Sequence, residues 1–373
     1  MVVKKINIFI GMIIVAAFVL CSCEYNEYLE SIGLAKRQTT ETDAIAPQNC
    51  EPQSKLPGNE PRTASSGNMH MQQEKLETSN HNGFTQSQVN VKVFYQLHDK
   101  TIVPVTRKIA KQEGIARAVL TGMIDNSISR EELAYYGLYP VLPEGTKILG
   151  LTVRDKEAKV DFSSELLKYK DQRDEINIIS SVAYALMQFP TVDKVRILIE
   201  GRQISKLKYG LDISEPFSRD RIMINSDRII CSSENIKYDV YYCKAVQNKY
   251  YLLPFSFETK PASDTELLKK MIDKLCQKPL NDSMHTEFPE ESRVLDVSID
   301  GSKATINMNE QFIKYGGTLK EQAILSQIEH TVGQFSQIAT VYLKVNSKQC
   351  ELPEGSDISK GLKITGRINE IME

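Results

Sequence analysis

The stretch "LPEGTKILGLTVRDKEAKVDF" (residues 142–162) occurs a second time, in modified form, as "FPEESRVLDVSIDGSKATINM" (residues 288–308). Pro143, Glu144, Leu149 and Ala158 recur unchanged 146 residues later, and most other positions keep their character. Each stretch holds two short runs of alternating apolar and polar residues joined by a polar turn, which is typical of half-buried β-strands. The repeat predicts a duplicated domain.

The same elements flank both copies of this stretch. An alternating strand, "VKVFYQL" or "YDVYY", comes first, and a helix containing Met-Ile-Asp (residues 123–125 and 271–273) follows it. A second helix, a β-branched strand and a closing Gly-x-Asp-Ile-Ser complete each copy. The predicted core positions of the first helix are Ile115, Val119, Leu120, Met123 and Ile124. Those of the second helix are Ile178, Ile179, Val182, Leu186 and Phe189, matched by Ile324, Leu325, Ile328, Val332 and Phe335.

The predicted fold is α+β, with two tandem copies of a β-α-β-β-α-β unit. Alternation in the strands indicates a sheet with one face packed on the two helices and the other partly solvated. We expect the units at residues 90–220 and 236–368, separated by a polar joint. Residues 126–146 are predicted to be a loop, and Thr318 with Glu321 to form a capping box for the last helix.

The N-terminus has the features of a bacterial lipoprotein signal. Lys4 and Lys5 precede an apolar run of 13 residues, Ile8 to Leu20. Spanning a bilayer takes about 20 residues, so this run fits a signal peptide better than an anchor. It ends in Leu-Cys-Ser-Cys, which resembles a lipobox and predicts a signal peptide at residues 1–22 and lipid attachment at Cys23. An uncleaved membrane anchor is the alternative.

Residues 23–89 are predicted to be a disordered tether. They are rich in Gln, Asn, Ser, Thr, Glu and Pro and lack periodicity, so they cannot bury enough apolar surface to fold. A flexible coil of this length would reach roughly 40–50 Å. The tether contains Met69, His70 and Met71, a spacing that could bind copper, but we interpret the triplet as linker.

Composition and motifs exclude several functions. With a formal charge of −2, 41% hydrophobic and 25% charged residues, the chain is globular and has no basic excess for nucleic acid. None of the five histidines, His70, His81, His98, His285 and His330, has metal-ligand or catalytic spacing. Glu144 and Glu290 recur, but their place in a Pro-Glu pair favours a turn over catalysis. We therefore expect no enzyme activity and no cofactor or metal.

Cysteine usage leaves disulfide pairing open. Beyond Cys21 and Cys23 the chain has an odd set without a C-x-x-C motif: Cys50, Cys231, Cys243, Cys276 and Cys350. The first copy has none, so the fold does not require a disulfide. Buried thiols plus one tether thiol are expected, and a bridge from Cys243 to Cys276 is the alternative.

With these motifs, the chain resembles the tandem-GerMN lipoproteins of endospore-forming bacteria, the GerM type of sporulation and spore germination protein. The resemblance covers roughly residues 90–365 and includes the closer "GLDISEPFSR" (residues 210–219). It implies a non-enzymatic protein lipid-anchored at the extracytoplasmic face of the cell membrane, in the intermembrane space around the forespore. It also implies a fold similar to ring-building motifs, association with copies of itself, and partners in the envelope or the sporulation channel complex.

Three functions follow as hypotheses. The leading one is a protein–protein assembly or scaffold module in sporulation and spore germination, because duplication without a catalytic signature favours surfaces over chemistry. The second is an extracytoplasmic solute- or peptidoglycan-binding lipoprotein, with Tyr135, Tyr136 and Tyr139 as stacking surfaces. The third is a hydrolase that uses Glu144 and Glu290.

Overall fold

The computed structural model describes residues 88–279 and 283–371 of the 373-residue chain. The predicted signal peptide, the lipid attachment at Cys23, most of the tether with Met69–Met71, and Cys50 therefore lie outside the described residues. Among the residues described, no helix is long and apolar enough to cross a membrane.

The duplicated α+β order predicted from the sequence is confirmed. The first unit contains β1 (Gln88–Gln96), β2 (Ile102–Ala110), α2 (Ile115–Thr121), α3 (Ser127–Ala134), β3 (Tyr139–Pro140), β4 (Ile148–Arg154), β5 (Glu157–Phe162), η1 (Ser164–Leu167), α4 (Gln172–Met187), β6 (Lys194–Ile199) and β7 (Phe217–Ser218). The second contains β8 (Ile236–Val246), β9 (Lys249–Thr259), α5 (Asp264–Leu275), β10 (Val294–Asp300), β11 (Lys303–Met308), η2 (Glu310–Ile313), α6 (Thr318–Val332), β12 (Thr340–Val345), β13 (Lys348–Gln349) and β14 (Leu362–Lys363).

Each unit has two separate sheets rather than one. β1 and β2 form an antiparallel hairpin, to which β3 adds a short third strand, and β8 and β9 form the matching hairpin. The repeated stretch forms β4–β5 and β10–β11, each an antiparallel pair. The next strand, β6 or β12, joins in parallel after the long helix crosses over.

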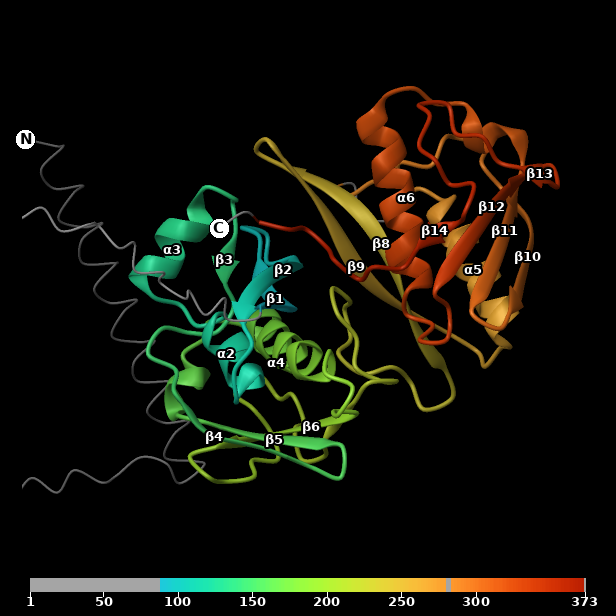
Figure 1. Ribbon diagram of the computed structural model, residues 1–373. Coiled ribbons are helices and arrows are strands. Elements are labelled where there is room, and N and C mark those ends of the chain that lie inside the picture. Colours follow the sequence, from blue (N-terminus) through green and yellow to red (C-terminus); the bar gives the residue numbers. More distant parts are fainter. Residues whose placement is uncertain (1–87, 280–282, 372–373) are drawn as a thin grey trace, which may run out of the picture.

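α2 and α4 in the first unit, and α5 and α6 in the second, lie between the two sheets, so each unit has three layers (Figure 1). α4 contacts β1 on one side and β6 on the other, and α5 likewise contacts β8 and β10. Consequently α4 buries far more than the predicted apolar face: Ile178, Ile179, Val182 and Leu186 are buried, as expected, together with several polar residues. Phe189, predicted as a fifth core position of this helix, follows the end of α4 and is only partly buried. Most buried apolar residues of both units form one continuous cluster, and Cys243, Leu252 and Ile368 form a small separate one.

Two predictions about the first unit were wrong in detail. α2 ends at Thr121, so Met123 and Ile124 follow the helix instead of belonging to it. The predicted loop at residues 126–146 contains α3, a mostly polar helix whose start is fixed by reciprocal hydrogen bonds between Asn126 and Ser129. A helix without an apolar stripe gives no periodic signal, which is why the sequence pattern missed it.

A glutamine after each long helix holds the hairpin in place. Gln188 follows α4; its side-chain Oε1 accepts from the Lys92 N–H at 2.7 Å and its Nε2 donates to the Lys92 carbonyl at 2.8 Å. Gln334 makes the same pair with Asp239, at 2.9 and 2.6 Å. In both units one amide side chain thus takes the place of a neighbouring strand along β1 or β8.

A buried glutamate anchors the closing loop in each unit. Glu175 accepts hydrogen bonds from the backbone N–H groups of Tyr209 (2.8 Å) and Leu211 (3.0 Å) and from the Tyr169 hydroxyl. Glu321 does the same for Glu354 (2.8 Å), Ser356 (3.0 Å) and the Tyr315 hydroxyl (3.0 Å). Both glutamates are 0% exposed.

The predicted capping box at Thr318 and Glu321 is therefore wrong. Gly317 occupies the cap position without a side-chain cap, and Glu321 faces inward to the closing loop. Burial works to raise the pKa of the Glu321 carboxyl. Hydrogen bonds from Ser356, Glu354 and Tyr315 outweigh it, so the pKa is lowered and the carboxylate stays ionised.

We expect Glu321→Ala to lower the free energy of unfolding by about 2–3 kcal/mol, because the change removes a charged acceptor and leaves its hydrogen-bond donors without a partner. Urea denaturation measures this, with the exposed Glu351→Ala as the matched control. The lowered pKa predicts stability present above the unfolded-state pKa of about 4.3 and lost as pH falls through the folded pKa. Equal stability of the two variants at neutral pH would contradict the role of Glu321.

Candidate functional site: the joint between the two units

The two units meet along their hairpins. β2 of the first unit contacts β9 of the second. Ile224 and Asn225, which follow the first unit, and Ile368 and Asn369, which follow the second, both reach this contact. The joint was predicted to be a polar connection near residues 217–235. It also carries buried apolar side chains, Ile222, Met223, Ile224 and Ile229.

The tail of the first unit bonds to both units. The Asn225 side chain accepts from the Ile102 N–H at 2.7 Å and donates to the Ile102 carbonyl at 2.8 Å, within its own unit. It also donates to the Pro254 carbonyl of the second unit at 2.9 Å. Next to it, Ile224 N–H donates to Ser256 Oγ at 2.8 Å, and the Ser256 N–H returns a bond to the Ile224 carbonyl at 3.1 Å.

The tail of the second unit repeats this arrangement in reverse. Asn369 pairs with Leu252 of its own unit at 2.8 and 2.7 Å and donates to the Pro104 carbonyl of the first unit at 2.9 Å. Ile368 and Thr106 exchange two bonds of 2.8 Å. Both asparagines adopt positive φ, 51° and 48°, a region that Asn tolerates better than most residues.

The joint therefore has an approximate two-fold arrangement. In a two-fold interface each contact from one partner to the other has a counterpart in the opposite direction. Here the Ile-Asn dipeptide of each tail meets the hydroxyl residue and the proline of the other unit's hairpin. Each tail completes the neighbouring unit, so the pair is held together from both sides.

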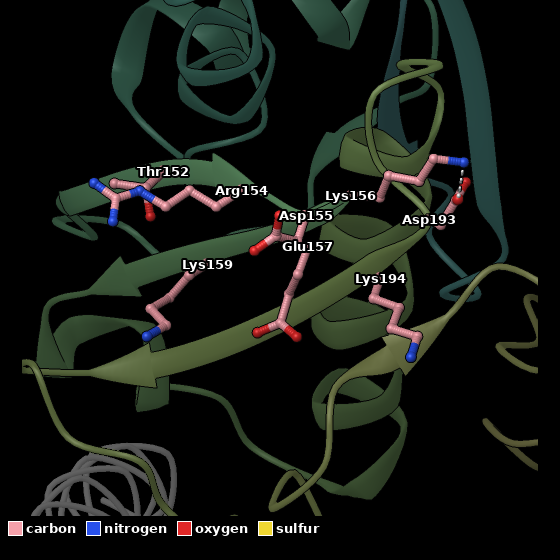
Figure 2. Close-up of a pocket in the computed structure, with 8 residues that line it drawn as sticks. All are labelled: Thr152, Arg154, Asp155, Lys156, Glu157, Lys159, Asp193 and Lys194. Atoms are coloured by element: carbon pink, nitrogen blue, oxygen red, sulfur yellow. Dashed lines mark ion pairs between the residues drawn. The ribbon is translucent and has the colours of Figure 1, made fainter.

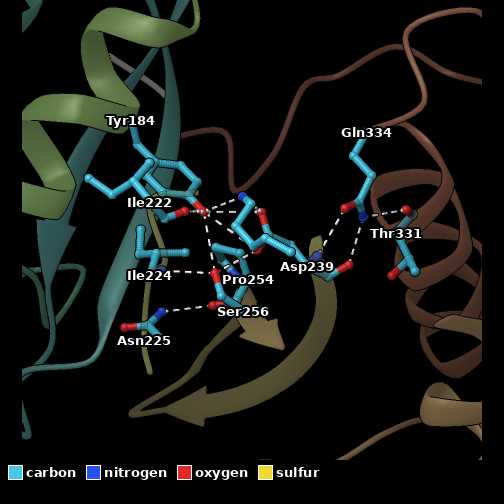
Figure 3. A network of polar contacts seen from close by, with 10 residues as sticks. Tyr184, Ile222, Ile224, Asn225, Asp239, Pro254, Ser256, Thr331 and Gln334 are labelled. Atoms are coloured by element: carbon cyan, nitrogen blue, oxygen red, sulfur yellow. Dashed lines mark hydrogen bonds and ion pairs between the residues drawn. The ribbon is translucent and has the colours of Figure 1, made fainter. Parts of the chain in front are cut away.

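A buried polar cluster occupies one side of the joint (Figure 3). The hydroxyl of Tyr184, on α4, lies 3.2 Å from Asp239 Oδ2 and 3.3 Å from Ser256 Oγ, and accepts from Lys237 Nζ at 2.8 Å. Burial raises the pKa of Tyr184 to about 12, and the Asp239 carboxylate adds to this. Burial works to lower the pKa of Lys237. Asp239 and Tyr184 outweigh burial, so the pKa is raised and the ammonium stays charged. Each charge in the cluster has an opposite partner.

The other side of the joint carries different residues at corresponding positions. His330 stands on α6 where α4 has Tyr184, and Lys92 stands on β1 where β8 has Asp239. His330 is 8% exposed, and its ring lies 5.4 Å from that of Tyr241. Burial lowers the pKa of His330 to about 4; Glu329 opposes this shift and Lys92 adds to it. The imidazole is therefore neutral at pH 7.

The remaining sequence candidates lie away from the joint or in structural roles. Glu144 and Glu290 are exposed in turns, as predicted, and Glu144 pairs with Arg130 at 2.6 Å. The four cysteines of the described chain, Cys231, Cys243, Cys276 and Cys350, are free, so the bridge from Cys243 to Cys276 is not formed. Burial raises the pKa of the Cys243 thiol to about 12.

Of the three tyrosines predicted as stacking surfaces, Tyr135 and Tyr139 are exposed and Tyr136 is partly covered. Tyr135 is 70% exposed, but its ring packs edge-on against Tyr136 with centroids 5.1 Å apart. Lys249 of the second unit lies over both rings, and Tyr136 is half-buried. In the described part of the chain, no His, Cys, Asp or Glu side chains group as metal ligands. His98 and His285 lie beside Tyr139 and Tyr250, respectively.

The outer face of the β4–β5–β6 sheet carries a shallow groove of about 690 Å³ (Figure 2). Its lining is charged: Thr152, Arg154, Asp155, Lys156, Glu157, Lys159, Asp193 and Lys194. Three of these charges form ion pairs: Lys156 pairs with Asp193 at 3.1 Å, and Glu157 pairs with Arg196, outside the lining, at 2.7 Å.

Comparison with known families identifies the duplicated unit. The model of the Germane family, described as sporulation and spore germination, matches residues 92–205 and again residues 239–351. The chain belongs to the Germane family. Spore germination protein GerM of Bacillus subtilis strain 168 is 26% identical over 274 residues, covering 71% of this chain and 72% of that protein. The family resemblance stated from the sequence is confirmed.

A solved structure has the same tandem arrangement. The tandem GerMN domains of the sporulation protein GerM from Bacillus subtilis superimpose with a TM-score of 0.65 at 24% identity, over 77% of this chain and 100% of that structure. At this identity the likeness establishes the fold. Both Germane units are thus present in one recognised tandem fold.

The joint of the Germane units was missed from the sequence, although its signal was present. The Ile-Asn dipeptide occurs after each closer, at residues 224–225 and 368–369. A match of two residues is too short to be recognised in the sequence alone. It becomes meaningful only when the hairpin residues that the dipeptide contacts are known.

We expect Asn369→Ala to lower the free energy of unfolding by about 1–3 kcal/mol, because the change leaves buried backbone groups on both units without partners. Native-state hydrogen exchange should also show faster exchange at Leu252, whose N–H bonds to Asn369. The exposed Asn90→Ala serves as the control. Unchanged protection at Leu252 would contradict the proposed joint.

We expect His330→Tyr, which copies the first unit, to remove a pH dependence of stability. The lowered pKa of His330 means that the unfolded chain binds a proton below about pH 6.5 while the folded chain does not until about pH 4. Wild-type stability should therefore fall between these values as pH is lowered. Denaturation midpoints at several pH values measure this, and an identical fall in the variant would count against it.

Proposed function

We propose that this protein is a non-enzymatic, membrane-anchored lipoprotein that serves as an assembly or scaffold module in sporulation and spore germination. The observation that carries the proposal is the pair of Germane units joined through a two-fold exchange of tails. Such a joint presents two related surfaces in a fixed relation. That property suits a protein which brings others together.

The polar residues that recur in both units have structural contacts. Glu175 and Glu321 hold closing loops, and Gln188 and Gln334 hold hairpins. The alternative role, binding of solutes or peptidoglycan, has weaker support because Tyr136 is half-buried and Lys249 lies over the rings of Tyr135 and Tyr136.

The proposal includes the place of the protein in the cell. Lipid attached to Cys23 would hold it at the extracytoplasmic face of the membrane, and residues 24–87 would separate the Germane units from that lipid. Stable anchoring takes more than one acyl chain, as lipoprotein modification supplies. The partners would be envelope proteins, including those of the sporulation channel complex, and further copies of this chain.

Deletion of the gene tests the function. We expect fewer heat-resistant spores, or spores that germinate slowly, with recovery when the wild-type gene is restored. Cys23→Ala should leave the protein folded but move it from the membrane fraction to the soluble fraction. Spores of normal number, heat resistance and germination in the deletion strain would contradict the proposed role.

Crosslinking in sporulating cells tests the partner class. The wild-type chain should capture envelope proteins or itself, and Asn225→Ala combined with Asn369→Ala should capture less, because the fixed relation of the units is lost. Asn90→Ala is the control. Crosslinking that gives only the isolated monomer would contradict an assembly role.

A further inference from the structure

We propose that the basic outer sheet face of the first unit docks onto a membrane containing anionic phospholipid. This rests on the proposed lipid anchor for the location of the protein, but the contact itself depends only on folded residues. Three observations support it: a shared face, cations without ion pairs, and different residues at these three positions in the second unit.

The pairing of the strands places the basic side chains on one face. Lys159 lies opposite Thr152, and Glu157 lies opposite Arg154 on one side and beside Lys194 on the other. The intervening residues of β5, Ala158 and Val160, are 0% exposed and point toward the helices. Because side chains alternate along a strand, Lys159 and its neighbours point outward. Figure 2 shows Arg154, Lys159 and Lys194 projecting from this sheet.

The outward charge is mainly positive. Lys156 and Arg196 are neutralised by Asp193 and Glu157. Arg154, Lys159 and Lys194 are exposed and form no ion pair with any described residue. Three free cations therefore line one groove, together with a single unpaired carboxylate, Asp155.

The second unit shows that the fold does not need these cations. At the positions of Arg154, Lys159 and Lys194 it has Asp300, Thr305 and Thr340, in strands of the same order and register. The repeated sheet is thus stable with an acid and two hydroxyl residues there. These three positions are thus basic in the first unit alone, whereas the sheet of the second unit carries its exposed cations elsewhere, at Lys303 and Lys344.

Physical chemistry favours lipid headgroups as the occupant. A broad, shallow, open sheet face suits a surface of many phosphates better than a small anion, which needs converging donors. Juxtamembrane Lys and Arg each add about 1 kcal/mol of binding to an anionic leaflet, or roughly fivefold in affinity. Three cations should therefore change vesicle binding about a hundredfold at moderate ionic strength.

The test uses an unlipidated chain beginning at Glu24, which keeps every described residue, and vesicles of phosphatidylcholine with or without about one-third phosphatidylglycerol. We expect binding only to the anionic vesicles. The triple variant Arg154→Gln, Lys159→Gln, Lys194→Gln should lose it about a hundredfold. The matched control Lys303→Gln, Lys344→Gln, Lys348→Gln removes the same charge from exposed residues of the second unit and should keep most of the binding. Thermal unfolding checks that both variants fold.

Three results would overturn the proposal: no preference of the wild-type chain for anionic vesicles, equal binding by the first-unit triple variant, or equal losses in both triple variants. Binding to isolated cell wall but not to vesicles would also overturn it and point to a wall polymer. Since the assay uses no lipid anchor and no cellular partner, its failure is distinguishable from failure of the proposed assembly role.

Discussion

The exchange of tails between the two units is the constraint on which the tandem arrangement depends. Asn225 and Asn369 each bond a hairpin of their own unit and a backbone carbonyl of the other. Such groups would be costly to bury unpaired, so the units cannot separate without exposing or stranding them. The joint therefore couples the two cores, most of whose buried apolar residues form one continuous cluster. A scaffold benefits from this coupling because its surfaces keep a fixed relation.

The duplication serves as an internal comparison that separates structural from functional residues. The glutamates that hold the closing loops and the glutamines that hold the hairpins are kept in both units, because each satisfies buried backbone groups that both copies share. The cations of the first sheet face are not kept. Where the two units have different residues at corresponding positions, the shared fold does not require either residue. Such positions are where separate roles of the two units would reside.

Differences at the joint follow the same logic. The Tyr184 hydroxyl contacts two opposite charges, Lys237 and Asp239, whereas His330 lies near Lys92 and Glu329. A two-fold interface made from identical copies would carry the same residues on both sides. Joining the copies in one chain removes that requirement. Each side of the joint can then hold a group with different titration behaviour without disturbing the other.

The amino-acid sequence by itself determined the duplicated α+β order, the strand faces and most core positions, because periodicity and repetition are local properties of the chain. It also marked the Pro-Glu turns correctly. It could not reveal α3, which lacks an apolar stripe, or the inward direction of Glu321, which looked like part of a helix cap. Only the tertiary structure decided that α2, α4, α5 and α6 lie between two sheets and that Ile-Asn tails cross between the units (Figure 1). These features depend on contacts between residues far apart in the chain, and no short-range pattern encodes which distant backbone group a buried side chain will satisfy.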